Sequence, residues 1–200
     1  SDEVSLAADL YETSFVHLVA IYVPAAAGMI LVARPAVTTV FGRAYVDAVP
    51  AVQVFGVYTL LVALDQITND GLDYLGRARS RAVVKGVTSV ANVALNVALI
   101  PVYGVVGATA ATVATYSVLV AVELYIVADE LPISVGYLAR TVGTVLAITA
   151  GMSVAVYALL PYVSGLPSLL AVIGVAVALW ALLSTLSGLL DIDRVRAVLA

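Results

Sequence analysis

The chain has 200 residues, of which 63% are hydrophobic and 11% are charged, and its formal net charge is −4. A mean hydropathy of +1.12 leaves too few polar side chains to cover the surface of a soluble domain. The absence of cysteine excludes disulfides, thiol catalysis and cysteine metal sites, and a single His17 argues against a histidine metal site. The acidic balance argues against nucleic acid, which requires a basic face. We therefore expect membrane lipids around the chain, and no metal or cofactor in it.

Six apolar segments follow one another, each near the roughly 20 residues that a helix needs to cross the hydrocarbon core. We expect transmembrane helices at residues 14–33, 49–75, 82–100, 105–127, 141–160 and 166–190. Residues 1–13 are expected to form an amphipathic lead-in at the membrane interface, and residues 191–200 a polar tail. Because helices satisfy their backbone hydrogen bonds internally, the predicted fold class is an all-α polytopic membrane protein.

Prolines and polar turns divide the predicted segments. Pro24 lies inside the first segment and should kink it, because proline removes one backbone hydrogen bond. The pair Arg34-Pro35 is expected to end that segment. The run 101–104, Pro-Val-Tyr-Gly, is expected to close the third segment, and the run 129–132 should separate the fourth from the fifth.

The distribution of Lys and Arg predicts the orientation, because cytoplasmic loops carry an excess of both. With six crossings, seven basic residues fall on one side of the membrane: Arg77, Arg79, Arg81, Lys85, Arg140, Arg194 and Arg196. Only Arg34 and Arg43 fall on the other side. We therefore expect a plasma-membrane protein in which both ends of this segment are cytoplasmic.

Polar side chains within the predicted helices are the candidate site, because such residues usually face a bundle interior or a water-filled cavity. We predict that seven residues line a substrate cavity, five on the second segment and two on the fourth: Gln53, Tyr58, Asp65, Gln66, Asn69, Thr112 and Tyr116. Segments one, two and four are expected to line this cavity, whereas segments five and six pack outside it. Segment six is almost wholly apolar and is expected to face lipid.

Other polar residues have two interpretations. Asp65 either lines the cavity or pairs with Lys85 or with an arginine of the following loop. Four residues are divided between ion binding and a structural or interfacial role: Asn92, Asn96, Glu123 and His17. The two asparagines share a helical face and would otherwise hydrogen-bond a neighbouring helix. Glu123 would otherwise extend to the headgroup level, and His17 would lie at the interface rather than relay protons.

Small residues recur at intervals of four in three rows: Gly107-Ala111-Thr115, Gly143-Ala147-Gly151 and Gly174-Ala178. Such rows let helix backbones approach closely in lipid. They predict helix packing, and we attach no functional role to them.

Several short motifs occur in one order along the chain: Pro24, Phe41-Gly42-Arg43-Ala44-Tyr45, Leu75-Gly76-Arg77-Ala78-Arg79, Asn92-x-x-x-Asn96, Ile100-Pro101-Val102-Tyr103-Gly104, the run of Gly, Ala and Thr at 107–112, and Asp191-Ile192-Asp193. With these motifs, residues 34–127 resemble the C-terminal lobe of the prokaryotic polysaccharide exporters. These are lipid-linked oligosaccharide flippases of the MATE-like (MOP) superfamily. One Lys against eight Arg and the acidic loops favour a salt-adapted, haloarchaeal source, with a GC-rich genome as the alternative.

The resemblance implies a six-transmembrane-helix lobe whose partner is an N-terminal six-helix lobe missing from this sequence. It implies a flippase that moves a lipid-linked oligosaccharide or polysaccharide precursor by alternating access between the lobes. The alternatives are a cation-coupled multidrug exporter of the same superfamily, a membrane-embedded lipid-modifying enzyme, and a scaffold lobe. The sequence contains no nucleophile elbow, phosphate loop or convincing catalytic carboxylate pair, so no enzyme activity is expected. Only Lys85 among the cations approaches the membrane interior, whereas a phosphate-binding cavity requires buried cations.

Overall fold

The computed structural model describes residues 2–189, which form helices and contain no strand. The α-helices are α1 (Asp2–Val40), α2 (Val49–Tyr74), α3 (Ala78–Glu130), α4 (Val135–Leu159) and α5 (Leu166–Leu186). Two short 3-10 helices, η1 (Arg43–Ala48) and η2 (Leu160–Tyr162), connect α1 to α2 and α4 to α5. All five α-helices are long and apolar enough to cross a membrane, so the chain has the build of a multi-pass membrane protein.

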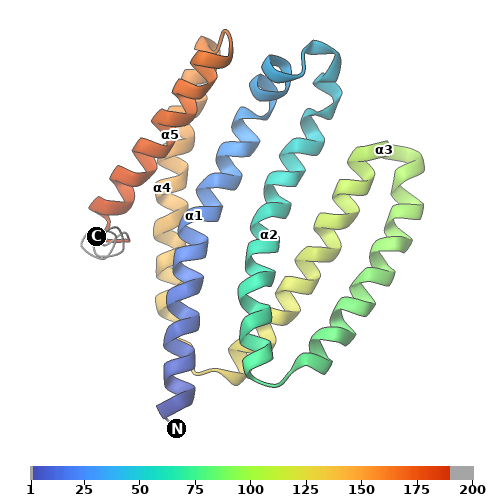
Figure 1. Ribbon diagram of the computed structural model, residues 1–200, viewed down its shortest axis with the longest axis vertical. Helices are drawn as coiled ribbons and strands as arrows, with labels where there is room; N and C mark the ends of the chain where they lie inside the picture. The colour runs from blue at the N-terminus through green and yellow to red at the C-terminus, as the bar shows by residue number, and fades with distance from the viewer. Residues whose placement is uncertain (1, 190–200) are drawn as a thin grey trace.

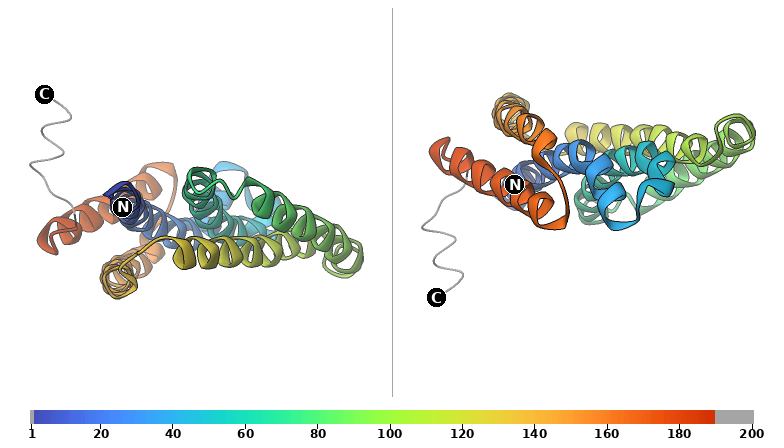
Figure 2. Two further views of the ribbon diagram at one scale, coloured as in Figure 1. Left: turned by 90° about the horizontal axis from the view of Figure 1, so that it is seen from below. Right: turned by 90° about the horizontal axis from the view of Figure 1, so that it is seen from above.

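The helices stand in a row with α1 near its middle (Figure 1). On one side α1 packs against α2, which in turn packs against α3. On the other side α1 packs against α4, and α5 contacts both. Views along the helices show that this row is elongated, with α3 and α5 at opposite ends (Figure 2). Large apolar side chains cover the outside of the row, as the hydrocarbon interior of a bilayer would require.

Helix α3 folds back on itself at Gly104, where the backbone leaves the helical region (φ 57°, ψ −135°). The helix direction reverses there, and the two arms lie beside each other (Figure 1). The segments expected at 82–100 and 105–127 therefore lie in the two arms of one 53-residue helix. The label α3 covers both arms, so five labelled helices stand where six segments were expected, and the non-helical backbone at Gly104 divides α3 between the two segments. We call residues 78–103 the first arm and residues 105–130 the second arm.

Helix α1 is longer than the segment expected at 14–33. It begins at Asp2, so residues 2–13 belong to the helix and do not form a separate lead-in. The reason is packing, because Ala8 and Tyr11 are buried in one cluster with Leu72 of α2 and Val127 of α3. The helix also continues through Pro35 to Val40, contrary to the expected end at Arg34-Pro35. Proline inside a helix is tolerated when neighbouring groups satisfy the freed backbone atoms.

At Pro24, where the sequence predicts a kink, the carbonyl that the proline leaves without its helical donor has a specific partner. Because proline has no N–H, the carbonyl of Ala20, four residues earlier, loses its helical donor. The indole N–H of Trp180, on α5, donates to this carbonyl at 2.9 Å. This bond joins residues 160 positions apart and attaches α5 to the middle of α1.

The remaining boundaries differ by a few residues from those expected. Helix α4 begins at Val135 rather than at 141, directly after the turn at 131–134. Helix α5 ends at Leu186, and the predicted tail at 191–200 lies outside the described residues. The third segment, expected to begin at residue 82, begins at Ala78, directly after the short loop that follows α2.

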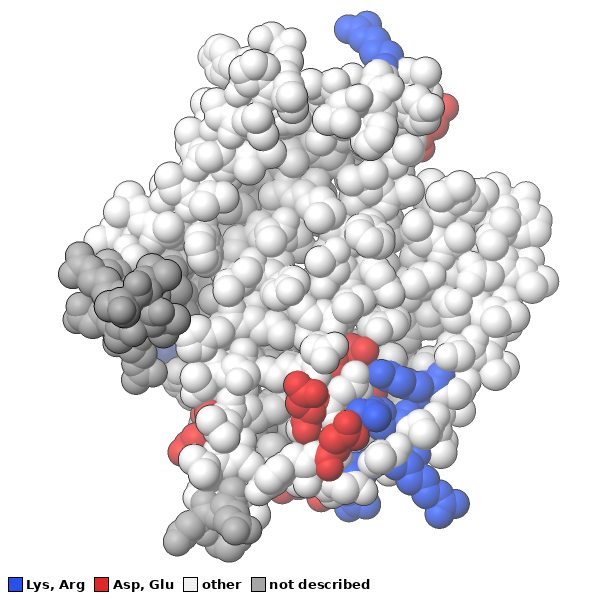
Figure 3. Space-filling view, viewed as in Figure 1, with Lys and Arg blue, Asp and Glu red and all other residues white. Residues whose placement is uncertain are grey.

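Charged side chains gather at one end of the row. The helices run in alternating directions, so the loop between α2 and α3 and the start of α4 lie at the same end. This arrangement brings together Arg77, Arg79, Arg81, Lys85 and Arg140, and we call it the basic end; Arg194 and Arg196 lie outside the described residues. Acidic and basic side chains cluster there around α2 and α3, below a broad band that is almost free of charge (Figure 3).

Of the three rows of small residues, one packs as expected. Gly107, Ala111 and Thr115 are buried along the second arm of α3. A Cβ on Gly107 would stand 2.5 Å from the carbonyl oxygen of Leu99, so the two arms touch there through their backbones. The rows on α4 and α5 are not packed in this way, because Gly143 and Gly174 have open space around them.

Candidate functional site

A polar groove runs between α2 and the two arms of α3, with a volume of about 430 Å³. Ten residues line it, eight of them polar: Tyr58, Lys85, Thr88, Ser89, Asn92, Val93, Thr112, Thr115, Tyr116 and Leu119. Polar residues are expensive within a membrane, so a wall with this composition needs water, a ligand or internal partners. We call this feature the polar groove.

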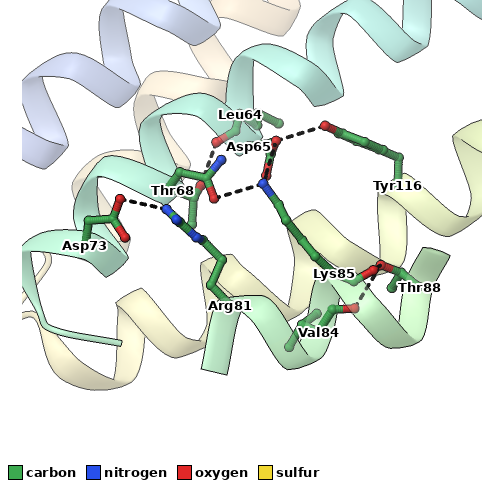
Figure 4. A network of polar contacts seen from close by, with 10 residues as sticks. Leu64, Asp65, Thr68, Asp73, Arg81, Val84, Lys85, Thr88 and Tyr116 are labelled. Carbon is green, nitrogen blue, oxygen red and sulfur yellow. Dashed lines mark hydrogen bonds and ion pairs between the residues drawn. The ribbon is translucent and has the colours of Figure 1, made fainter. Parts of the chain in front are cut away.

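An ion pair lies at the end of the polar groove that is nearer the basic end. Lys85 Nζ stands 3.2 Å from Asp65 Oδ1, and it donates to Asn69 Oδ1 at 3.3 Å. The hydroxyl of Tyr116 donates to Asp65 Oδ2 at 2.8 Å. Three segments thus converge on one carboxylate: α2 carries Asp65, the first arm carries Lys85, and the second arm carries Tyr116 (Figure 4). Asp65 is only 6% exposed, which explains why it needs these partners.

Helical periodicity explains this convergence. Asp65 and Asn69 are four residues apart on α2 and therefore project from the same face. Of the two interpretations of Asp65, the structure shows the partner of Lys85. Its carboxylate lies behind the groove wall, because Lys85 and Tyr116 cover it. Nearer the basic end, Arg81 donates to Asp73 at 2.7 Å and holds the first arm against α2.

The two asparagines of the first arm form a short hydrogen-bonded chain. The amide of Asn96 donates to Asn92 Oδ1 at 2.8 Å, and the amide of Asn92 donates to Thr115 Oγ1 at 3.0 Å. The alternative of a helix–helix contact is therefore the one that the structure shows for Asn92. Asn92 also lines the polar groove, so it contributes both to the contact between the two arms and to the groove wall.

Two tyrosines stand on the α2 side and the α3 side of the polar groove. The rings of Tyr58 and Tyr116 meet edge to face with their centroids 5.2 Å apart. Thr112, one turn before Tyr116, lines the groove as well. Aromatic faces and hydroxyls next to one another suit a ligand that presents both C–H groups and hydroxyls.

Three predicted site residues lie elsewhere. Gln53 donates to the carbonyl of Ile30 at 3.2 Å and links α2 to α1. Gln66 is exposed and, as the residue next to Asp65, projects from a different face of α2. His17 is exposed on α1, where its Nδ1 lies 2.6 Å from the carbonyl oxygen of Thr13. None of these three residues contacts the polar groove.

The helices that line the groove also differ from the prediction. Segment one, now part of α1, contributes no side chain to it, whereas the first arm of α3 contributes five. Lys85, Thr88 and Ser89 were not predicted as lining residues. The signal was available, because Lys85, Ser89, Asn92 and Asn96 are spaced by four, three and four residues along one helical face.

Glu123 is buried within the protein, whereas the expected headgroup position would leave its carboxyl group exposed. It is fully buried on the second arm, and neither oxygen of its carboxyl group has a hydrogen-bond partner. It interacts electrostatically with Asp65, Lys85 and Arg81. Glu123 is therefore part of the same charged cluster, although it lies outside the groove lining.

A second cavity, of about 450 Å³, lies between α1, α4 and α5. Its walls are almost entirely apolar and include Pro24, Met152 and Trp180. It has no charged residue, so it offers no recognition of a polar headgroup. Helices α4 and α5 accordingly contribute nothing to the polar groove.

Comparison of the chain with protein families, with characterised proteins and with solved structures finds no match. Within residues 2–189 no group of three or more His, Cys, Asp or Glu side chains is arranged to hold a metal ion. The polar groove and the charged cluster behind it are thus the candidate functional site of the described residues.

Proposed function

We propose that the chain is one lobe of a membrane flippase, and that the polar groove binds the headgroup of a lipid-linked oligosaccharide. The observation that carries the proposal is a groove lined by eight polar side chains, in a row of helices whose outer surface is apolar. A molecule with a polar headgroup and a long apolar tail matches both surfaces. The resemblance of residues 34–127 to polysaccharide exporters supports the same assignment.

The groove has the chemistry that such a headgroup requires. Lys85 is the cation that a phosphate would meet, and its side chain is 38% exposed despite its contact with Asp65. Ser89, Thr112 and Asn92 offer hydroxyl and amide groups to sugar hydroxyls. Tyr58 offers an aromatic face against which a sugar ring would pack.

A single lobe provides only one wall of the transport path that we propose. The N-terminal lobe of the same protein would face the polar groove, and the headgroup would be exposed alternately to each side as the lobes rock. The basic end would be cytoplasmic, in the plasma membrane, which places Lys85 where a cytoplasmic precursor enters. This scheme requires additional cations from the other lobe.

Binding can be tested with the purified chain in detergent micelles by native mass spectrometry. Three probes separate the parts of the ligand: dolichol, dolichyl phosphate and a dolichyl-phosphate-linked oligosaccharide. We expect affinity to rise in that order. Lys85→Gln should weaken binding of both phosphorylated probes roughly 10- to 100-fold, the worth of a charge-assisted hydrogen bond.

Two further variants make this experiment specific. Arg79→Gln removes the same charge from an exposed residue at the basic end and should leave binding unchanged. Ser89→Ala leaves the ion pair intact and should weaken only the glycosylated probe, roughly 2- to 10-fold. Equal affinity for dolichol and for the glycosylated probe would refute the proposal.

A cation-coupled exporter is the second candidate, and one observation favours it. Asp65 and Glu123 are both buried and interact with each other, as carboxylates of a coupling site would. Such an exporter would bind an amphipathic solute in the same groove without requiring a phosphate. Binding of organic cations in preference to dolichyl phosphate would support it over the flippase.

A further inference from the structure

Four buried oxygen atoms without hydrogen-bond partners belong to one connected group of side chains. They are the hydroxyl of Tyr11 on α1, both carboxyl oxygens of Glu123 on α3, and Oδ1 of Asp65 on α2, which accepts no hydrogen bond although Lys85 Nζ stands 3.2 Å from it. Tyr11 interacts electrostatically with Glu123, and Glu123 interacts with Asp65. Buried polar atoms almost always have hydrogen-bond partners, so four such oxygens on side chains that interact with one another call for an explanation.

The charges of this cluster do not balance. Asp65 and Glu123 would contribute two negative charges if both were ionised. Lys85, 3.2 Å from Asp65, supplies one positive charge. Arg81 also interacts with Glu123, but it is already bonded to Asp73 at 2.7 Å, and those two charges cancel. One negative charge remains uncompensated at a fully buried position, which is costly in a low-dielectric interior.

A single proton resolves both problems. On Glu123 it removes the excess charge and converts one carboxyl oxygen into a donor. Asp65, with which Glu123 interacts, has one oxygen, Oδ1, that accepts no hydrogen bond, whereas Oδ2 accepts from Tyr116 and from Lys85. One added proton thus supplies a donor to a group of oxygens that lacks one.

We propose that the Glu123–Asp65 pair is a proton-binding site that joins α1, α2 and α3. The groups that face it are Tyr11 from α1, Lys85 and Arg81 from the first arm, and Tyr116 from the second arm. Loss of the proton places two carboxylates against one lysine and weakens the contact between these helices. The inference stands independently of the lipid-linked substrate proposed above.

Infrared spectroscopy of the purified chain in lipid nanodiscs tests the site directly, because a protonated carboxyl group has its own C=O stretching band. We expect this band at neutral pH and its loss as the pH rises. Carbon-13 labelling of glutamate should shift it, because the proton is assigned to Glu123. Glu123→Gln should abolish the band, whereas Glu130→Gln, at a glutamate paired with Arg77, should retain it.

A second variant guards against misfolding of Glu123→Gln. Asp65→Asn keeps the shape and removes the negative charge opposite Glu123, which leaves Lys85 to balance Glu123, so the band should disappear at a lower pH than in the wild-type chain. The proposal fails if the wild-type chain shows no protonated carboxyl band at neutral pH. It also fails if glutamate labelling does not shift the band, because the proton would then belong to another group.

Discussion

At the scale of single residues, the ion pair of Asp65 with Lys85 is the contact that gives α2 and the first arm of α3 a common register. Lys85 Nζ and Asp65 Oδ1 are 3.2 Å apart, and the hydroxyl of Tyr116 donates a hydrogen bond to the other oxygen of the carboxylate. Replacing both members of a buried pair by apolar side chains is often nearly neutral, whereas removing one member leaves an unpaired charge. The pair therefore specifies the arrangement more than it stabilises the fold.

This asymmetry can be measured. We expect Lys85→Met to lower the free energy of unfolding by about 1–3 kcal/mol, because Asp65 remains buried without its cation. The double variant with Asp65→Leu should recover most of that loss, because no charge is then left unpaired. Thermal unfolding in detergent micelles measures each variant. A double variant less stable than Lys85→Met would mean that the pair contributes a large net stabilisation.

At the scale of helices, close approach and proline chemistry decide which elements touch. The two arms of α3 meet at Gly107, where an added methyl group would collide with the backbone at Leu99. On the other side of the molecule, Pro24 leaves the carbonyl of Ala20 without its helical donor, and the indole N–H of Trp180 donates to that carbonyl. Each contact depends on one residue type, so each can be tested by one substitution with a matched control.

The contact between the arms predicts the effect of a methyl group. Gly107→Ala should separate the arms and lower the unfolding temperature, because the Cβ would stand 2.5 Å from a carbonyl oxygen that belongs to the backbone. We expect a loss of about 1–3 kcal/mol, typical of overpacking. Gly143→Ala adds the same methyl group in open space and should be neutral or slightly stabilising. Equal effects at both positions would contradict the close approach.

The bond at the proline predicts a different signature. Trp180→Phe keeps an aromatic side chain but removes the N–H, so the carbonyl of Ala20 loses its donor. We expect a cost of about 1–3 kcal/mol, the penalty for an unsatisfied buried polar group. Hydrogen exchange should increase in the middle of α1 more than elsewhere. Pro24→Ala restores the helical donor, so in that background Trp180→Phe should cost much less; an equal cost would contradict the pairing.

Helix positions were predictable from hydropathy, and their partners were not. Asp65, Lys85 and Tyr116 were each identified as polar residues in apolar segments, and the pairing of Asp65 with Lys85 was one of two interpretations. Gln53 and Gln66 do not line the polar groove, because a helical stripe drawn from sequence does not say which side of the helix meets a neighbour. The long α1 was missed for the same reason, since residues 2–13 are held by contacts with α2 and α3.

At the scale of the whole molecule, the separation of charge along the row predicts how it sits in a membrane. Five of the described basic residues lie at the basic end, with Arg43 at the opposite end of α1. An almost uncharged band lies between the two ends (Figure 3). Because cytoplasmic loops are rich in Lys and Arg, the basic end is expected to be cytoplasmic.

The number of crossings depends on α3. Each arm holds about 26 residues and spans roughly 39 Å at the helical rise, more than the hydrocarbon core of about 30 Å. Two crossings by α3, with four by the other helices, would give the six expected from sequence. If the arms instead lay within one leaflet, the turn at Gly104 would not reach the far side.

Single-cysteine labelling of this cysteine-free chain decides both the orientation and the number of crossings. We expect Ala78→Cys to react only with reagents on the cytoplasmic side, because it lies at the basic end. Tyr45→Cys, in η1, and Tyr103→Cys, next to the turn of α3, should react only from outside, and both positions are exposed. A Cys at 103 that reacts from neither side would place the turn within the bilayer, and α3 would not cross twice. External labelling at position 78 would reverse the orientation, and Lys85 would then face the outer surface.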